Sequence, residues 1–396
     1  MTASAGWGVV EYRGREGMER LADDWRRLYA AMPLRTGFHA YETHLAYLEH
    51  LMAAPDKFRC IALTDGERLR AICPLEARLD RILGIPIRVW GMPLHPHFML
   101  SDVIGPEDDA RRELLPAVVA LLRSKPEGRR LLVVGPLPQE SVVWNGLQRL
   151  SASRCSTDHT MPASVFDCQL SFDELMARLS KHFRRNLRSH RNKLSAYRDA
   201  RFASATGAEI MAAFDVFLDL EASGWKGSSG AGSAIRLHPK VEAFYRTLAS
   251  TLGGDGSTDR CEINSLYADD RCLASHFCMH AGKEYAMLKI AYDEGAARLG
   301  PGLLLLERTL ERCCADPAVK RLNLESDGSW QRDWHPDLLL MQQTRIAIGR
   351  WSGSALVAAL RFRFGLGRRV VRWMRARTST VGPRSGTRPR PTPREP

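Results

Sequence analysis

The chain contains 396 residues, of which 44% are hydrophobic, and its formal net charge is +12, so it is long enough for two or three domains with buried cores. Residues 351–396 hold eleven Arg and one Glu and so carry +10 of that charge, while residues 181–202 hold eight Lys or Arg and one Asp. Charge gathered in two segments argues against a nucleic-acid surface over the whole body, and no apolar run reaches the roughly 18 residues that a membrane span needs.

The first 168 residues alternate between helical and strand patterns. Apolar residues spaced three or four apart predict an amphipathic helix over 17–31. Asp65-Gly66, between two strand-like runs, predicts a β-hairpin over 58–80. The other predicted elements are helices over 41–52, 110–124 and 141–150 and a buried strand over 131–137.

The second part of the chain repeats this alternation. Ser171 and Glu174 form a capping-box pattern that predicts one helix over 171–194, with four apolar residues on one face. The predicted order is an α/β (α+β) fold with central mixed β-sheets flanked by helices. The remaining predicted elements are helices over 209–221, 239–252, 303–314 and near 330–340, and strands over 261–269, 271–282, 284–294, 321–326 and 344–349.

We expect three segments: 1–168 as an N-terminal domain, 169–350 as a C-terminal domain, and 351–396 as a basic tail. The nine cysteines are an odd number without paired two-residue spacings and are interpreted as reduced thiols, with no metal site. HPHF at 95–98 has two His, but His-x-His in a Pro-containing loop is more typical of a turn. The opening residues MTASAGWGVVEYRG lack a leader pattern, so a cytoplasmic protein is expected.

A glycine turn follows the strand predicted over 284–292. Gly300 and Gly302 surround Pro301 at the start of a helix, and Arg298 lies just before them. Glycines allow close backbone approach, and the first N–H groups of a helix attract anions. The turn is therefore a candidate anion cradle, although Pro-Gly that simply starts a helix is the alternative. It matches neither the Walker loop nor the dinucleotide GxGxxG pattern.

Two titratable side chains lie on the strands that flank this turn. Alternation puts Lys289 on one face with Tyr285 and Met287, among apolar neighbours, where an ammonium needs a partner. Glu325 on the next strand is the candidate partner. The pair either positions and deprotonates a substrate or simply holds two strands together. His276, on the preceding strand, is a candidate general base or a hydrogen-bonded core residue.

The loop at 224–234, GWKGSSGAGSA, contains Trp225 and Lys226 among glycines. An aromatic side chain and a cation in a flexible loop suggest a segment that closes over a ligand, with Glu221 supplying a carboxylate. A solvated linker is the alternative interpretation.

The run KHFRRNLRSHRNKL at 181–194 has six Lys or Arg and no acid. Its cations, Arg184 and Arg188 among them, lie near an acidic substrate or coenzyme phosphate, form a solvated face, or contact RNA; nucleic acid is not the expected partner. In the tail, 352–377 is basic and amphipathic, so it either makes peripheral contact with an anionic membrane at the inner membrane surface or is solvated. Residues 378–396 are expected to be disordered.

Five motifs in order resemble one acetyltransferase family: FRRNLRSHRNKL, EASGWKG, LKIAYDE, LGPGLLLLE and ESDGSWQRDW. Together they resemble the CelD-like, GNAT-fold N-acetyltransferases found beside bacterial cellulose and exopolysaccharide biosynthesis genes. The resemblance covers roughly residues 5–350. The basic helix is also distantly similar to that of Fem-type aminoacyltransferases, which have two tandem GNAT-like domains.

The resemblance implies tandem GNAT-like domains, the first without its own coenzyme site, and an acyltransferase that moves an acetyl or other acyl group from acetyl-CoA or another acyl-CoA to an amine or hydroxyl. The acceptor would be a small molecule or saccharide, and no metal would be needed. The alternatives are a Fem-like aminoacyl-tRNA-dependent transferase and a non-catalytic membrane-surface or RNA-binding protein. The turn is one residue shorter than the usual GNAT turn, and Pro301 removes one N–H.

The same resemblance assigns roles to residues. Glu325 or Glu221, or else His276, would take the proton of the acceptor, and Lys289 would lie beside the reacting carbonyl. The coenzyme would be bound by Tyr292, Arg298, Leu299, Gly300, Pro301 and Gly302, and the acceptor by Trp225, Lys226, Arg184 and Arg188.

Overall fold

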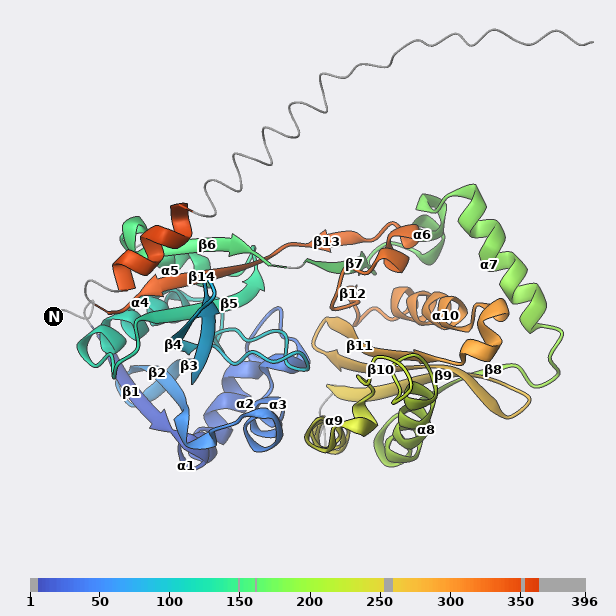
Figure 1. The fold of residues 1–396 in the computed structure, drawn as a ribbon. Helices are drawn as coiled ribbons and strands as arrows, with labels where there is room; N and C mark the ends of the chain where they lie inside the picture. The colour runs from blue at the N-terminus through green and yellow to red at the C-terminus, as the bar shows by residue number, and fades with distance from the viewer. Residues whose placement is uncertain (1–5, 149, 161, 253–258, 350–352, 363–396) are drawn as a thin grey trace, which may run out of the picture.

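A computed structural model describes residues 6–148, 150–160, 162–252, 259–349 and 353–362. These residues form two seven-stranded mixed sheets that lie side by side, each with helices against it (Figure 1). The predicted fold class, an α/β (α+β) fold with central mixed sheets flanked by helices, is confirmed. We call the first sheet with its helices the first half, and the second sheet with its helices the second half.

The first half contains most of the chain up to residue 160. Its predicted hairpin at Asp65-Gly66 is confirmed, and β1 and β4 are strands that the sequence patterns did not predict. Its elements are β1 (Trp7–Arg13), α1 (Gly14–Glu19), α2 (Ala22–Ala30), α3 (Tyr41–Ala46), β2 (Phe58–Asp65), β3 (Arg68–Ile82), β4 (Ile85–Gly91), α4 (Asp109–Ser124), β5 (Leu131–Pro138), α5 (Val143–Leu147), β6 (Cys155–His159) and β14 (Met341–Ala347).

The second half contains the predicted elements between residues 209 and 323 in order, but the strands Ala163–Asp167, Arg201–Ala205 and Asp337–Leu339 were not predicted. The helix predicted near 330–340 is wrong in its second part: only a short 3-10 helix over Ser329–Trp334 is present, because residues 337–339 pair with residues 163–165 in the sheet. The hairpin of the second half turns at Gly282 and Lys283, as predicted. Its elements are β7 (Ala163–Asp167), α6 (Phe172–Arg178), α7 (Lys181–Leu194), β8 (Arg201–Ala205), α8 (Ile210–Ser223), α9 (Pro239–Thr251), β9 (Arg260–Ala268), β10 (Arg271–Ala281), β11 (Glu284–Tyr292), α10 (Pro301–Ala315), β12 (Arg321–Asn323) and β13 (Asp337–Leu339).

The two sheets have the same topology. The first has the order β1-β2-β3-β4-β5-β14-β6 and the second has the order β8-β9-β10-β11-β12-β7-β13. In each sheet the fourth and fifth strands are parallel and are joined through a helix, and every other neighbouring pair is antiparallel. The chain therefore contains the same seven-stranded plan twice.

Each sheet takes one strand from across the expected boundary at residue 168. Strand β7 precedes that boundary but pairs with β12 and β13 in the second sheet. Strand β14 follows it but pairs with β5 and β6 in the first sheet. The chain thus passes between the halves after β6 and again after β13, as Figure 1 shows.

Two helices predicted as continuous are each divided in two. The predicted helix over 171–194 breaks between α6 and α7, where the Ser180 hydroxyl accepts a hydrogen bond from the Phe183 N–H and caps α7. Its four apolar residues nevertheless enter the same buried cluster. The predicted helix over 17–31 likewise forms α1 and α2, separated at Arg20 and Leu21.

The two halves share one hydrophobic core, which runs from α1–α4 of the first half to α8 and α9 of the second. Polar contacts reinforce this junction. The Tyr29 hydroxyl donates to the Asp259 carboxylate at 2.6 Å, and His50 lies 2.9 Å from the Thr247 hydroxyl. A shared, closely packed core makes the halves one rigid body, so side chains from both can contribute to one site.

A helix at 353–362 covers the outer face of the first sheet. Val357 and Leu360 are buried against Val89, Leu131 and Val133 of that sheet. The first part of the segment expected to contact a membrane therefore packs within the protein, because its apolar stripe is buried in a core. The rest of that segment, and the remainder of the tail, lie outside the described residues. Among the residues described, no helix is both long and apolar enough to cross a bilayer.

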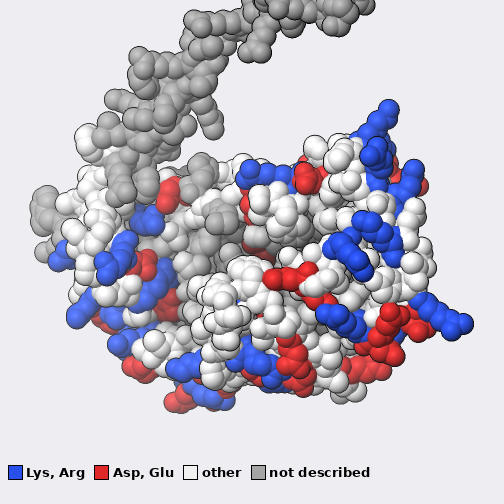
Figure 2. All heavy atoms as spheres, turned by 45° about the vertical axis from the view of Figure 1, so that its right-hand side comes forward, with Lys and Arg blue, Asp and Glu red and all other residues white. Residues whose placement is uncertain are grey.

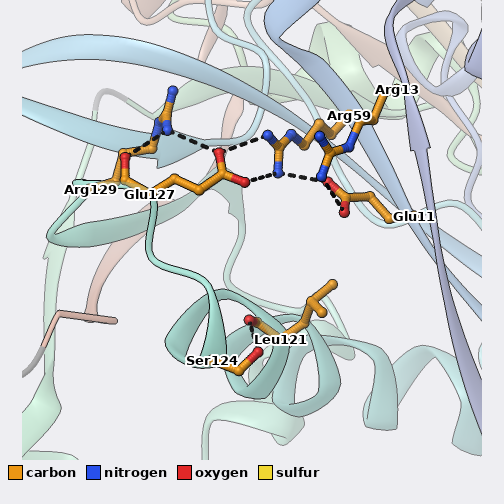
Figure 3. A network of polar contacts seen from close by, with 7 residues as sticks. All are labelled: Glu11, Arg13, Arg59, Leu121, Ser124, Glu127 and Arg129. Carbon is orange, nitrogen blue, oxygen red and sulfur yellow. Dashed lines mark hydrogen bonds and ion pairs between the residues drawn. The ribbon is translucent and has the colours of Figure 1, made fainter.

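A network of charges holds one edge of the first half together (Figure 3). Arg59 of β2 pairs with Glu127 at 2.7 Å and with Glu11 of β1 at 2.6 Å. Arg129 also pairs with Glu127, and the guanidinium groups of Arg59 and Arg129 lie 4.3 and 4.2 Å from the ring centroid of buried Trp90. Stacking of a guanidinium group on an aromatic ring in this way stabilises the first sheet.

Candidate active site

Strands β11 and β12 form the centre of the second sheet and then separate. Their parallel ladder has three pairs and ends at Ala286 and Asn323, while β11 continues to Tyr292. Beyond that point this side of β11 has no strand partner in the ladder. The separation opens a gap in the ladder, because β12 has no described residues paired with β11 beyond Ala286.

A β-bulge at Leu288 corrects the predicted face of Lys289. Phe277 of β10 pairs with Lys289 and Cys278 pairs with Met287, so Leu288 has no partner in the register. An extra residue reverses the alternation beyond it. Met287 therefore packs with α7 and α10, whereas Lys289 faces α9.

Lys289 approaches an aromatic ring and not the predicted carboxylate. Its Nζ lies 5.9 Å from the ring centroid of Tyr245 on α9, and among the described residues no ion pair joins it to Glu325. Burial and the charge of Lys226 lower the pKa of Lys289 to about 8, and Glu221 opposes that shift. Lys289 can therefore lose its proton close to neutral pH.

Glu325 lies just after β12 in a left-handed backbone conformation, with φ of 57°. Its N–H donates to the Asn323 side chain at 2.8 Å, which fixes the turn. Burial, together with the charge of Glu284, raises the pKa of Glu325 to about 8, and Arg321 opposes that shift. Left-handed geometry in a residue other than glycine is concentrated at functional sites, so the expectation that Glu325 matters gains a structural basis.

The glycine turn opens α10 without a side-chain cap. Gly300 is the N-cap, with φ of 59°, and Pro301 is the first helical residue. A Cβ on Gly300 would meet the His190 ring at 2.8 Å, whereas a Cβ on Gly302 would meet nothing within 4 Å. The first turn of α10 contains no acid, and the first N–H groups of a helix lack intrahelical partners and lie at the positive end of its dipole.

Helix α7 packs beside this turn. His190 faces Gly300, and the Lys193 ammonium donates to the Arg298 carbonyl at 3.3 Å. Arg184 and Arg188, two of the four residues predicted to bind the acceptor, are exposed on the same helix, and Figure 2 shows Lys and Arg side chains gathered at this end of the molecule. The cations of α7 thus add positive charge near the turn.

The loop at 224–234 is tied to β11. Lys226 donates to the Glu221 carboxylate at 2.9 Å and to the Ile290 carbonyl at 2.8 Å, and Glu221 also accepts from the Ile235 N–H. These bonds satisfy both side chains within the protein, so they anchor the loop. Trp225 is 57% exposed and lies on the outer surface of this loop.

Of the remaining predicted residues, His276 lies apart from the loop at 224–234, whereas Tyr292 lines the same small pocket as Trp225 and Lys226. His276 is buried beside Cys278 on the face of β10 that packs against α10, and burial lowers its pKa to about 3. Tyr292 and Arg298 are exposed at the end of β11 and in the turn after it, while Leu299 is buried beneath that turn. Arg298 and Leu299 directly precede Gly300, and the contact of these three residues with a coenzyme stays a prediction.

Two histidines that sequence reasoning set aside approach this site from the first half. The Nδ1 of His97 lies 3.2 Å from the Tyr245 hydroxyl, and its ring meets the Tyr245 ring edge to face. His95 is stacked obliquely beside His97 at 5.5 Å. Burial and the charge of Lys289 lower the pKa of His97 to about 3. The HPHF spacing was a usable signal, but only the packing of the halves reveals what it faces.

A cavity of about 140 Å³ lies between the halves. Side chains from the α2–α3 connection, the β4–α4 connection and β5 of the first half line one wall. Glu284 of β11 and Arg321, Asn323 and Glu325 of the β12 region line the other. No group of three His, Cys, Asp or Glu side chains placed to hold a metal ion occurs in the part of the chain that the structure describes.

Comparison with known proteins identifies one domain. A family model described as an acetyltransferase (GNAT) domain matches residues 181–325. These residues include α7, the glycine turn, α10 and Glu325. No curated protein has a sequence that matches the chain.

Solved structures with a similar fold cover nearly the whole chain. FemX is 11% identical, with a TM-score of 0.53 over 82% of this chain and 95% of FemX. A conserved protein of unknown function from Bacteroides thetaiotaomicron is 15% identical, with a TM-score of 0.50 over 82% of this chain and 97% of that protein.

The C-terminal domain of a putative lysylphosphatidylglycerol synthetase from Agrobacterium fabrum is 10% identical, with a TM-score of 0.50 over 86% of this chain and 96% of that domain. At these identities the likeness concerns the fold alone. The chain therefore has a tandem GNAT-like fold, and residues 181–325 of its second half match the model of a GNAT acetyltransferase domain.

Proposed function

We propose that the protein transfers an acyl group from acyl-CoA, most simply acetyl-CoA, to an amine or hydroxyl of a small-molecule or saccharide acceptor. The observation that carries this proposal is the β11–α10–β12 crossover. It combines an uncapped, acid-free helix N-terminus with a gap between parallel strands. The former suits a pyrophosphate and the latter suits a thioester arm. The CelD-like resemblance extends the proposal to a cytoplasmic role in bacterial exopolysaccharide or cellulose biosynthesis.

The residues present fit this co-substrate. The open space over Gly302 admits a ligand to the backbone, and the Lys193 and Arg298 side chains add positive charge beside it. The thioester itself supplies an activated carbonyl. Attack requires a group that takes a proton from the acceptor, and Glu325 is the carboxylate best placed, because Glu221 is already satisfied by Lys226 and a backbone N–H.

A Fem-like aminoacyl-tRNA-dependent transfer is the second candidate, and the exposed cations of α7 favour it. An RNA ligand would bind with an affinity that falls steeply with salt. Unacylated tRNA titrated against the protein at 50 and 200 mM salt would separate the candidates. We expect weak binding, and a specific tRNA complex would support the Fem-like reading.

Calorimetric titration with acetyl-CoA tests the main proposal. We expect one site per chain, with affinity that falls in the order of wild type, Gly302→Ala and Gly302→Val, because each added carbon fills the open space over the turn. The free energy of unfolding should change little across this series. Equal affinity in all three proteins would remove the turn from the site, and absence of acetyl-CoA binding would remove the proposal.

A further inference from the structure

The cavity between the halves contains polar atoms that the protein itself leaves unpaired. His39 is 3% exposed and lines the cavity. Its Nδ1 accepts a hydrogen bond from the Thr36 N–H at 3.1 Å, so the proton of the neutral ring is on Nε2. That Nε2–H has no acceptor among the described residues. Burial lowers the pKa of His39 to about 3, so the ring stays neutral.

Three further groups in the same cavity are unpaired in the described structure. They are the Nε of Arg111, the hydroxyl of Thr160 and the Oε1 of Glu325. Arg111 is 4% exposed, and its other nitrogens face Asp102 at 2.7 Å and Glu107 at 3.8 Å. Leaving a buried donor or acceptor unpaired costs about 1–3 kcal/mol. Four such groups around one cavity therefore indicate a polar ligand that completes them.

The charge of the cavity specifies that ligand further. Five carboxyl groups line it, and only two guanidinium groups, although the whole chain carries +12. Each guanidinium is shared by two of the acids: Arg321 with Glu284 and Glu140, and Arg111 with Asp102 and Glu107. The fifth acid, Glu325, has no cation of its own within ion-pair distance in the described residues. Even with Glu325 protonated, four acids face two guanidinium groups, and such an excess of acids favours a cation.

We infer that this cavity is the acceptor site, and that it takes a small molecule with an amino group beside hydroxyl groups. The inference rests on the proposed function, since it assigns the second substrate of that reaction. The ammonium lies toward Glu325, while hydroxyl oxygens accept from the Nε2–H of His39 and the Nε–H of Arg111. The hydroxyl of Thr160 completes the set. The apolar side chains of Leu100 and Met341 cover the carbon skeleton.

The transfer step balances with these groups. The Glu325 carboxylate takes one proton from the ammonium and leaves a neutral amine. The amine nitrogen attacks the thioester carbonyl carbon, the carbon–sulfur bond breaks, and the thiolate leaves. The second proton of that nitrogen goes to the thiolate, so the products are the amide, the free thiol and protonated Glu325. The charged or titratable groups around Glu325 are Glu284, Arg321, Tyr245 and, from the first half, His39, Asp102, Glu107, Arg111 and Glu140.

Three sugars that differ only in the substituent on C2, an amine, a hydroxyl or an acetamide, test the acceptor class. Release of coenzyme A thiol from acetyl-CoA is measured with D-glucosamine, D-glucose and N-acetyl-D-glucosamine. We expect D-glucosamine to accelerate release and the other two to have no effect, because they lack a free amine. Equal rates with D-glucosamine and D-glucose, or no acceleration by any probe, would overturn the inference.

Two variants then test the cavity as the site. Thr160→Val removes the hydroxyl at constant shape, and His39→Asn keeps an oxygen for the Thr36 N–H but removes the Nε2 donor. Each should raise the KM for D-glucosamine about 5- to 10-fold, as expected for one lost hydrogen bond, at unchanged acetyl-CoA affinity. Thr64→Val, on β2 outside the cavity, is the matched control and should leave both constants unchanged. An unchanged KM in folded Thr160→Val and His39→Asn places the acceptor elsewhere.

Acetyl-CoA titration of the same protein preparations distinguishes a wrong acceptor site from a wrong acyl-transfer function. If acetyl-CoA binds but D-glucosamine fails as described, the acceptor inference is wrong and the proposed acyl transfer stands. If acetyl-CoA does not bind to the wild-type protein, the proposed function fails first and the inference falls with it.

Discussion

The two crossovers of the molecule have one topology and contrasting chemistry. Each is a strand, a helix and a parallel strand, and each parallel ladder has three pairs. Aligned in order, Val89, Leu131 and Val133 of the first ladder correspond to Glu284, Arg321 and Asn323 of the second. The first set is buried under the helix at 353–362, and the second lines the cavity. Of the two copies of this scaffold, the first thus has an apolar, buried crossover, while the second carries polar groups at the corresponding positions.

The N-termini of the two crossover helices, α4 and α10, also differ: the first is capped by a carboxylate and the second is not. Helix α4 begins with Asp108, whose carboxylate accepts from the N–H groups of Ala110 and Arg111 at 3.0 and 3.4 Å. Helix α10 begins with Gly300, which has no side chain to offer. An N-terminus filled by its own carboxylate cannot also hold a pyrophosphate. This difference supports the expectation that only the second half binds a coenzyme.

Glu325→Gln should have the largest effect, because it removes the proposed proton acceptor at constant shape. We expect kcat for acyl transfer to fall at least about 100-fold, the usual scale for general-base catalysis, with acetyl-CoA affinity unchanged. Glu76→Gln is the control in the first sheet, since Glu76 is also buried and accepts from Tyr47 at 2.5 Å. That variant should lose stability but keep its kcat. A Glu325→Gln enzyme within twofold of wild type removes Glu325 from the chemistry.

The next largest effect is expected in the dependence of the acyl-transfer rate on pH. Because the pKa of Glu325 is raised to about 8, its carboxyl is protonated below that pH and cannot accept a proton. Transfer should therefore rise roughly tenfold per pH unit up to about 8 and then level. Lys289 titrates in the same range, so Lys289→Met is the control. Persistence of the rise in Lys289→Met assigns it to Glu325, and its disappearance there assigns it to Lys289.

Local patterns predicted much of the fold and the co-substrate side of the site. The hairpins at Asp65-Gly66 and Gly282-Lys283 and the glycine turn before α10 depend on residues close in sequence, and all three are present. The break at Ser180 was missed because the apolar spacing continues across it. The exchange of β7 and β14 was missed because strand partners are chosen by packing across the whole chain.

The acceptor side of the site depends on contacts between distant segments. The bulge at Leu288 turned Lys289 to the other face, and no alternation pattern in one strand reveals a bulge. His39 and His97 reach the site only because the halves share a core. Their neighbours in sequence are ordinary loop residues, so single-sequence reasoning assigned His97 to a turn and did not single out His39.

Gly300→Ala should have a smaller effect, a loss of unfolding free energy. One part of that loss comes from the left-handed backbone and the other from contact with the His190 ring. Gly128, after α4, also has a positive φ, of 73°, but open space around it. A left-handed non-glycine residue costs about 1–2 kcal/mol, so Gly128→Ala should lose about that much unfolding free energy. Gly300→Ala should lose more, because the new Cβ meets His190, and should also weaken acetyl-CoA binding. Adding His190→Ala should restore part of the extra loss in urea unfolding. Equal losses at both glycines would contradict the contact.

Asp108→Ala should have the smallest effect and tests the comparison most directly. Removing an N-cap carboxylate costs about 0.5–2 kcal/mol of unfolding free energy, and the lost contact between Asp108 and Arg70 at 2.8 Å adds little at a half-exposed site. The variant also uncovers the N–H groups of α4. If the cap alone keeps the first half from binding a coenzyme, acetyl-CoA titration should now show two sites per chain. We expect one, because Val89, Leu131 and Val133 remain dry beneath the helix at 353–362 and leave no gap for a thioester arm.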